Sequence, residues 1–143
     1  HCTSAYPAKP ESINLRAMLT LQAAFGCLVG FSDHSLGINL PTAAVAMGAK
    51  MIEKHMTLNK SDPGPDHRAS LEPGEFYQMV VGIREVEAAM GTGRKVPSPS
   101  ERSTKDVARK SLFARRDIRQ GEMLKPDMVM AQRPGTGISP DAL

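Results

Sequence analysis

Two short polar clusters, SDH at 32–34 and EKH at 53–55, contain the residue types in this sequence that could carry chemistry. The neutral imidazoles of His34 and His55 are two of the ligands that proteins offer to a divalent metal ion, with water and substrate oxygen filling the other positions. Histidines at strand ends also cap backbone groups, and this wide spacing is not a compact metal signature. A metal site and ordinary strand-end histidines are therefore both open interpretations of the pattern.

The segments around these clusters predict a strand, a helix and a second strand. Apolar residues 28–31 and 50–52 predict the strands, and the alanine-rich segment 40–48 predicts the helix, with Pro41 in its first turn and Gly48 at its end. A crossover of this length joins parallel strands, whose carboxyl ends meet at one edge of a sheet. Both histidines are therefore predicted to lie at the same edge.

Alternation along a strand predicts which neighbours share a face with each histidine. Ser32 falls on the face of His34, and Glu53 on the face of His55. A carboxylate in that position could orient a metal ligand or handle a proton. The candidate catalytic residues are therefore His34, His55 and Glu53.

The rest of the first part of the chain extends the same alternation. Residues 1–7 begin as the end of a strand, a helix is predicted over 11–25, and a long polar loop occupies 57–70. A further helix is predicted from Pro73 to the residue before Gly91. Three strands alternating with three helices predict a parallel α/β unit, which is too small to close an eight-stranded barrel by itself.

A different pattern follows. Residues 93–104 contain two prolines and three serines without periodicity, which predicts a linker. Short strands are predicted over 111–114 and 128–131, with a turn around Gly121. They indicate a small β-rich module over 105–143, and this module is expected to be incomplete.

Composition excludes several classes of protein. Hydrophobic residues make up 41% of the 143 residues and charged residues 23%, which is typical of a globular protein and not of a disordered one. The net charge of +3 suits an anionic small substrate. The basic stretch 94–119 has only Phe113 for base stacking, so nucleic-acid binding is not expected.

The sequence also gives expectations about the cellular compartment of the protein and about whether the chain is part of a longer one. Cys2 and Cys27 form no CxxC pair, which favours reduced thiols. Because no long apolar run or signal peptide is visible, we expect a cytoplasmic protein without a membrane partner. The chain begins with His1, immediately before a strand-like run, so it is expected to be the later part of a longer protein.

Longer motifs are more specific than the paired histidines. Together they resemble the bacterial N-acetylneuraminate (sialic acid) synthase family, over nearly the whole chain and in the family's order. The motifs are HCTSAYP at 1–7, FSDHSLG at 31–37, MIEKHMTLNKSDPGPDHRASLEP at 51–73, ARKSLFARRDIRQGEMLKPDMV at 108–129 and RPGTGISP at 133–140.

The resemblance implies a fold and a reaction. Residues 1–92 would form the C-terminal part of a (β/α)8 TIM barrel, and residues 105–143 the start of a small SAF (antifreeze-like) domain. The implied reaction condenses phosphoenolpyruvate with N-acetylmannosamine to give N-acetylneuraminate and phosphate. The family also implies a homodimer in which the SAF domain of one subunit covers the active site of the other.

The resemblance also implies roles near the predicted strand ends. His34 and His55 match the family's two ligands to a divalent metal ion, typically Mn²⁺, with Mg²⁺ or Co²⁺ as alternatives. Ser32 matches a contact to phosphoenolpyruvate. Ser4 stands where some relatives have asparagine, so its role as a further phosphoenolpyruvate contact is open.

Three more residues match the sugar site. Asp66 matches a carboxylate that hydrogen-bonds sugar hydroxyls, and Tyr6 lines the same pocket. Arg133 matches the SAF arginine that reaches the N-acetyl group in the other subunit, a task that suits its fixed fork of donors. The simpler alternatives are a turn cap for Asp66, rim packing for Tyr6 and a surface position for Arg133.

Several functional alternatives stay open. The glutamate and lysines on the family's early barrel strands are not in this chain, so the isolated segment is expected to be inactive. Legionaminate synthases, which act on a diacetamido sugar, share the PGPDH and SLEP motifs at 63–67 and 70–73 and are the second candidate, whereas pseudaminate synthases generally lack them. A non-catalytic carbohydrate-binding or assembly module is the candidate from another class.

Overall fold

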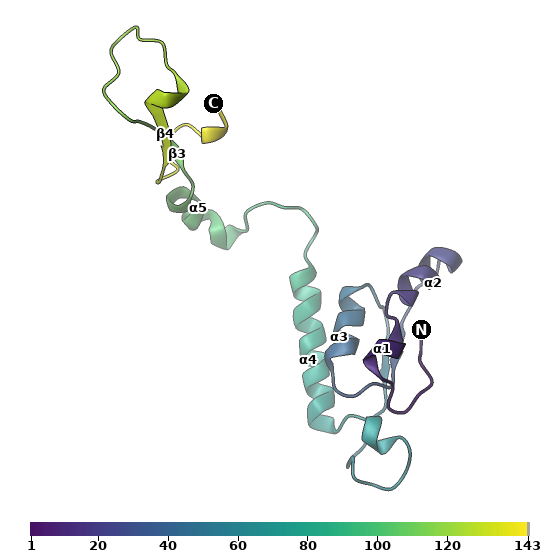
Figure 1. The fold of residues 1–143 in the computed structure, drawn as a ribbon. Coiled ribbons are helices and arrows are strands. Elements are labelled where there is room, and N and C mark those ends of the chain that lie inside the picture. The colour runs from purple at the N-terminus through teal and green to yellow at the C-terminus, as the bar shows by residue number, and fades with distance from the viewer. Residues whose placement is uncertain (143) are drawn as a thin grey trace. The chain divides into compact units, whose positions relative to one another are not determined.

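The computed structural model describes residues 1–142, and the chain divides into two compact units, His1–Gly93 and Arg94–Leu143 (Figure 1). Each unit has its own secondary structure. Among the described residues, no helix combines the length and apolar character needed to cross a membrane.

The first unit alternates short strands with helices and a 3-10 turn. In chain order its elements are α1 Pro10–Ile13, α2 Ala17–Phe25, β1 Phe31–Asp33, α3 Asn39–Ala46, β2 Ile52–Lys54, the 3-10 helix η1 His67–Ala69 and α4 Pro73–Met90.

The two strands of this unit are parallel neighbours, as the crossover through α3 predicts. In the register of β1 and β2, Phe31 pairs with Ile52, Ser32 with Glu53, and Asp33 with Lys54. The chain start adds a third parallel segment, because Cys2 bridges Ser32 and Ser32 N donates to His1 O at 2.9 Å. The strand order is therefore Cys2, β1, β2.

The strands lie closer to the polar clusters than predicted. The expected strands at 28–31 and 50–52 overlap the ladder at the pair Phe31 and Ile52, and the hydrogen bond from Lys50 N to Val29 O precedes it. The ladder then continues through the polar residues that follow, up to the pair Asp33 and Lys54. The apolar runs marked the location of the strands but not their ends.

The helix predicted over 11–25 is two helices, so that prediction was wrong in its continuity. Asn14 has φ 51° and ψ 59°, a left-handed conformation that ends α1 before α2 begins. Asparagine tolerates this conformation better than most residues. Gly26 ends α2 in the left-handed conformation, and the predicted end of the helix at residue 25 is confirmed.

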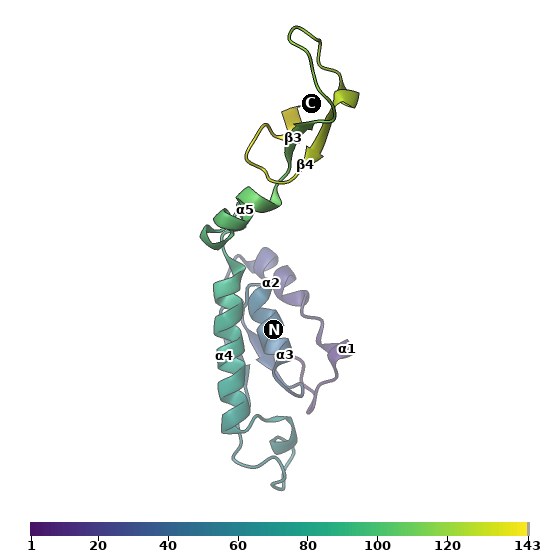
Figure 2. The ribbon, with the colours of Figure 1, turned by 90° about the vertical axis from the view of Figure 1, so that its left-hand side faces the viewer.

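The core lies between the sheet and the helices that cover one of its faces. Phe31 of β1 packs in a buried cluster with Ile13, Met18 and Ala44. Helices α3 and α4 lie side by side in both ribbon views and are in contact (Figures 1 and 2). Helix α4 begins at Pro73 as predicted, with a reciprocal capping box between Glu72 and Glu75 at its first turn.

The second unit is built on an antiparallel strand pair. Strand β3 Ser111–Ala114 pairs with β4 Val129–Gln132, so the first predicted strand is confirmed and the second is shifted by one residue. The other elements are the 3-10 helix η2 Pro99–Glu101, α5 Arg102–Ala108, and the 3-10 helices η3 Pro126–Met128 and η4 Pro140–Ala142. The stretch 93–104, predicted as a linker, thus contains η2 and the start of α5.

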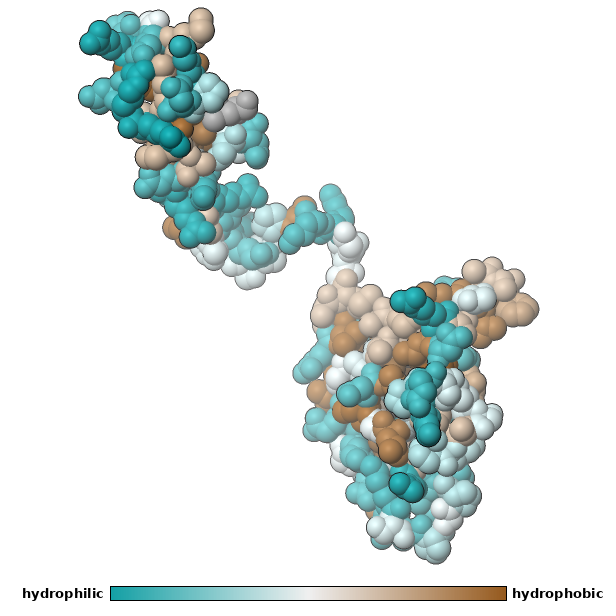
Figure 3. Space-filling view, in the orientation of Figure 1, coloured by the Kyte–Doolittle hydropathy of each residue, from teal (hydrophilic) through white to brown (hydrophobic). Residues whose placement is uncertain are grey.

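Hydrophobic surface is unevenly distributed between the units. In Figure 3 the first unit shows broad brown areas, whereas the second is mostly teal. Two of the exposed apolar side chains are Leu28 and Met51, at 79% and 73% exposure. They line a shallow pocket at the start of β1 and β2, together with His1 and Cys2.

Candidate functional site

The histidines that follow β1 and β2 lie together. The ring centroids of His34 and His55 are 5.1 Å apart and their planes are inclined at 83°. Both follow the last residue pair of the parallel ladder by one position. This confirms the prediction that the crossover brings the two imidazoles to the same edge of the sheet.

Tyr6 completes a group of three rings, which we call the ring cluster: Tyr6, His34 and His55. The phenol ring stacks on His34 with centroids 4.2 Å apart and lies 5.6 Å from the ring of His55. Tyr6 is 46% exposed, whereas His34 is buried. The tyrosine therefore covers one face of the inner imidazole and borders the solvent.

The hydrogen bond of His34 indicates which of its nitrogens could bind a metal. Nδ1 lies 2.9 Å from the backbone oxygen of Thr3. Because a carbonyl can only accept, Nδ1 carries the proton and Nε2 keeps its lone pair. Such a bond from the second ring nitrogen to a carbonyl is the usual support of a metal-binding histidine.

The donors available around the ring cluster fit part of a metal site. Over residues 1–142, no three histidine, cysteine or carboxylate groups come together in a group that could hold a metal. Two imidazoles leave most positions of a divalent ion open. Open positions are typical of a catalytic site, where water or substrate oxygen binds the ion directly.

Ser32 and Glu53 form a second polar contact, on neighbouring strands. They are register partners, and Ser32 Oγ donates to Glu53 Oε1 at 2.7 Å. The Glu53 side chain is exposed. The hydrogen-bond partner of the Glu53 carboxylate is thus Ser32, and the predicted roles of Glu53, in orienting a metal ligand or handling a proton, stay predictions.

A buried ion pair lies on the opposite face of the same strands. Lys54 Nζ donates to Asp33 Oδ2 at 2.7 Å, and both side chains are fully buried. This pair was not predicted from the sequence. Its signal was the opposite charge of the two residues that immediately precede His34 and His55.

The polar loop after β2 is held at several points. Met56 and Leu71 form a parallel bridge, and Thr57 Oγ1 lies 2.8 Å from His67 Nδ1. Lys60 Nζ donates to Glu75 Oε1 at 2.5 Å. This hydrogen bond, followed by one from the backbone N–H of Glu72, holds the pKa of Glu75 below its ordinary value.

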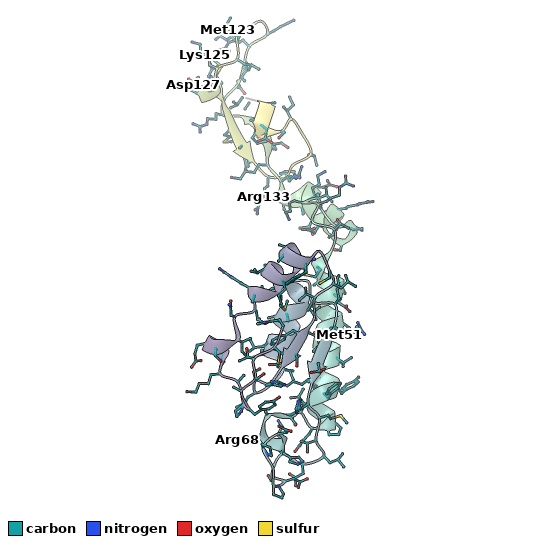
Figure 4. All side chains as sticks on the ribbon, turned by 90° about the vertical axis from the view of Figure 1, so that its right-hand side faces the viewer. Met51, Arg68, Met123, Lys125, Asp127 and Arg133 are labelled. Atoms are coloured by element: carbon teal, nitrogen blue, oxygen red, sulfur yellow. The ribbon has the colours of Figure 1, made fainter. Side chains whose placement is uncertain are left out.

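Asp66 lies exposed in this loop, immediately before η1. Its carboxylate makes no capping hydrogen bond to η1, and it is the backbone oxygen that accepts from the amides of Ala69 and Ser70. The side chain therefore does not have the turn-capping role that was its simpler interpretation. Figure 4 labels Arg68, two residues further along the same loop.

Two candidates remain, Ser4 in the first unit and Arg133 in the second. Ser4 is exposed, two residues before Tyr6. Arg133 belongs to the second unit, where it follows β4 and its Nε donates to Ala108 O at 2.8 Å (Figure 4). Within its own unit, Arg133 therefore lies against the end of α5.

Comparisons with known proteins agree with this description. Residues 1–95 match the model of the NeuB family, and residues 109–143 match that of the SAF domain. The chain is 50% identical over 138 residues to an uncharacterized protein of Methanocaldococcus jannaschii, covering 96% of this chain and 41% of that protein.

A named relative and a solved structure show the same similarity. The N,N'-diacetyllegionaminic acid synthase of Legionella pneumophila is 48% identical over 143 residues, which are 100% of this chain and 40% of that protein. The crystal structure of the N-acetylneuraminic acid (sialic acid) synthetase of Leptospira borgpetersenii matches with a TM-score of 0.65 and 38% identity, covering 73% of this chain and 36% of that one. The chain thus spans about two fifths of the length of the curated relatives it matches. With a family model that covers residues 1–95, the chain belongs to the NeuB family.

Proposed function

We propose that the protein containing this chain is a metal-dependent synthase that condenses phosphoenolpyruvate with N-acetylmannosamine, giving N-acetylneuraminate and phosphate. The observation that carries the proposal is the ring cluster, in which His34 and His55 meet at the carboxyl ends of parallel strands. The similarity to a structure named as a sialic acid synthetase supports the same reaction class.

We infer that the first unit is the C-terminal part of a (β/α)8 TIM barrel, and that the second is part of an SAF domain. The parallel order Cys2, β1, β2 supports the barrel, and so does the packing of helical residues Ile13, Met18 and Ala44 with Phe31 of β1. The exposure of Leu28 and Met51 at the starts of the strands also supports it, since further strands would cover such side chains. The chemistry then lies where barrel enzymes keep it, at the carboxyl ends of the strands.

His34 and His55 are the residues that would hold the metal ion, with Mn²⁺ proposed and Mg²⁺ or Co²⁺ as alternatives. When bound, such an ion supplies Lewis-acid polarisation of the sugar aldehyde oxygen. The protein's own contribution is to present Nε2 of His34, because Thr3 O fixes Nδ1. The stacked ring of Tyr6 keeps the His34 imidazole in that orientation and lines the sugar pocket.

The Ser32 hydroxyl and the Glu53 carboxylate, on neighbouring strands, would serve phosphoenolpyruvate. Before a substrate binds, Ser32 Oγ donates its one proton to Glu53 Oε1, and this hydrogen bond holds the hydroxyl in place. To contact anionic phosphoenolpyruvate, the hydroxyl would turn this proton to a substrate oxygen, and Ser4 is a further candidate contact. A carboxylate at that position can take up or return a proton during the reaction.

Asp66 would hold the sugar from the loop. An exposed carboxylate that makes no capping bond can accept hydrogen bonds from sugar hydroxyls. The loop that carries Asp66 is fixed by Thr57 with His67 and by Lys60 with Glu75, which keeps its position defined.

Arg133 would act in a homodimer, on the N-acetyl group bound by the partner subunit. Mixing two inactive variants tests this arrangement. If His55→Ala and Arg133→Ala subunits exchange freely at equal amounts, half of the dimers are mixed and one of their two sites is intact, so about a quarter of the activity returns (1/2 × 1/2). If Arg133 instead acts within its own subunit, mixing the two variants restores no activity.

The reaction itself is tested by phosphate release from phosphoenolpyruvate by the intact protein, with each sugar as acceptor. The proposal predicts Mn²⁺-dependent turnover with N-acetylmannosamine, and its loss in the His34→Ala and His55→Ala variants. His1→Ala is the matched control, since its ring is already bonded to Ile13 O. Turnover that persists without His34 and His55 would contradict the proposal.

Legionaminate synthesis from a diacetamido sugar is the second candidate, favoured by the 48% identity to the Legionella synthase. Preferred turnover of the diacetamido sugar would establish it in place of the first candidate. A non-catalytic carbohydrate-binding or assembly module predicts that neither sugar is turned over and that the histidine variants still bind glycan.

A further inference from the structure

We propose that the buried ion pair Asp33–Lys54 is a positioning device that sets the separation of His34 and His55 and thereby the affinity of the metal site. The inference rests on the proposed function, in which these two imidazoles hold the ion. It assigns a role to two residues that touch neither the metal nor the substrate.

The pair joins the two strands at the residues immediately before the histidines. Asp33 and Lys54 are register partners at the ends of β1 and β2, and their contact is 2.7 Å between Asp33 Oδ2 and Lys54 Nζ. Each partner is covalently adjacent to one histidine, so the ion pair joins the strands next to the ring cluster, in addition to the backbone hydrogen bonds of the ladder. We expect a change in this contact to move the two imidazoles relative to each other.

The same network clamps the chain on both sides of His34. Asp33 Oδ1 accepts from the amide of Ser35 at 2.8 Å, and Lys54 Nζ also donates to the backbone oxygen of Ser35. Residues 33 and 35 are thus both fixed to Lys54. With Nδ1 held by Thr3 O, the backbone and the ring of His34 are both held in place.

The location of the pair argues against a purely stabilising role. Asp33 lies on the helix-covered face with Phe31, and the Asp33 and Lys54 side chains are both fully buried. Removing two charges from water is costly, and well-packed apolar residues at such positions are often as stable as the ion pair. What apolar residues cannot supply is directional bonds to a chosen backbone segment, which is what Lys54 provides at Ser35.

The test compares Mn²⁺ binding by isothermal titration calorimetry in the intact protein and its variants. The main variant is Asp33→Leu with Lys54→Met, which removes both charges and leaves neither buried alone. We expect it to fold, with a cooperative thermal transition, and to bind Mn²⁺ about 10- to 100-fold more weakly. The electron paramagnetic resonance spectrum of bound Mn²⁺ is expected to broaden, because the ligands are no longer held in one geometry.

Ser35→Ala is the matched control. It keeps the backbone N–H and oxygen that make the bonds, and the Ser35 hydroxyl has no hydrogen-bond partner in the part of the chain that the structure describes. Its Mn²⁺ affinity should equal that of the wild type. A drop as large as that of the double variant would overturn the inference, because the hydroxyl is outside the clamp.

Asp33→Asn provides a second variant, should the double variant not fold. It keeps an acceptor for the Ser35 amide, removes the charge that faces Lys54, and is expected to weaken Mn²⁺ binding in the same direction. If either folded variant binds Mn²⁺ with wild-type affinity, this inference is overturned while the proposed function is unaffected. Absence of Mn²⁺ binding by the wild type would overturn the proposed function as well.

Discussion

The imidazole ring of His34 meets that of His55 edge to face, with centroids 5.1 Å apart. The relationship follows from the strand register, because Asp33 and Lys54 are paired and the histidines are the next residue on each strand. Parallel pairing thus brings two residues that are distant in the sequence to one edge. The fold thus brings the two residues together, and Thr3 O and the ring of Tyr6 hold the His34 imidazole in place.

Replacing Glu53 by glutamine separates a proton-handling role from a packing role. Glutamine keeps an oxygen that accepts from Ser32 Oγ and removes only the charge. We expect kcat to fall by roughly 10²- to 10⁴-fold, the usual contribution of a general acid or base, with Mn²⁺ affinity unchanged. Glu85→Gln, on the exposed side of α4, is the control. A variant with wild-type kcat would show that Glu53 handles no proton.

Replacing Asp66 by asparagine tests the sugar contact. Loss of a charged hydrogen bond costs about 1.5–3 kcal/mol, so KM for the sugar should rise about 10- to 150-fold while KM for phosphoenolpyruvate stays the same. Asp62→Asn changes a charge in the same loop and should leave both constants unaltered. Equal effects of the two variants on KM for the sugar would point to the net charge of the loop instead of a specific contact.

Gly30 is predicted to tolerate no side chain. A Cβ at this position would lie 2.8 Å from Met51 O and 2.9 Å from Met51 Cβ, so the backbone of the neighbouring strand would have to move. We expect Gly30→Ala to lower the free energy of unfolding by about 1–3 kcal/mol. Gly74→Ala meets nothing within 4 Å in the first turn of α4 and should be neutral or slightly stabilising. Urea unfolding of both variants checks this, and equal midpoints would contradict it.

The Lys60–Glu75 contact predicts a small acid sensitivity. The pKa of Glu75 is lower in the folded protein than in the unfolded chain, chiefly because of the hydrogen bond from Lys60, so the unfolded chain takes up its proton first as the pH falls. The stabilisation is complete above the ordinary glutamate pKa and is lost as the pH falls through the lowered value.

The size of this effect is limited by exposure, since the two side chains are 33% and 43% exposed. We expect less than about 1 kcal/mol. In the Lys60→Met variant, the difference in urea midpoint between about pH 7 and about pH 3 should be smaller than in the wild type. An identical pH dependence would mean that Lys60 does not lower the pKa of Glu75.

The strand–helix–strand crossover that builds the site could be predicted from the sequence. Pro41 and Gly48 indicate a helix long enough to connect two parallel strands. Parallel strands place His34 and His55 at one edge of the sheet. The pairing register was harder to predict, because runs of three or four apolar residues have no clear alternation. The opposite charges of Asp33 and Lys54 are visible in the sequence, but only the register shows that the two residues are partners.

Two local conformations also differ from those predicted from the sequence. Asn14 breaks a helix that the apolar spacing continues across, because that spacing carries no mark of a left-handed residue. In the stretch predicted as a linker, Ser98 and Glu101 form a capping box at the start of η2. The S-x-x-E signature was present, but the prolines and serines around it favoured irregular structure.

The most direct test of the metal site is anomalous diffraction at the manganese absorption edge, from crystals of the intact protein grown with Mn²⁺. We predict one peak within coordination distance of Nε2 of His34 and of a ring nitrogen of His55, absent from crystals of the His34→Ala variant. A peak bound by other residues, or saturating Mn²⁺ with no peak between the two rings, would contradict the account.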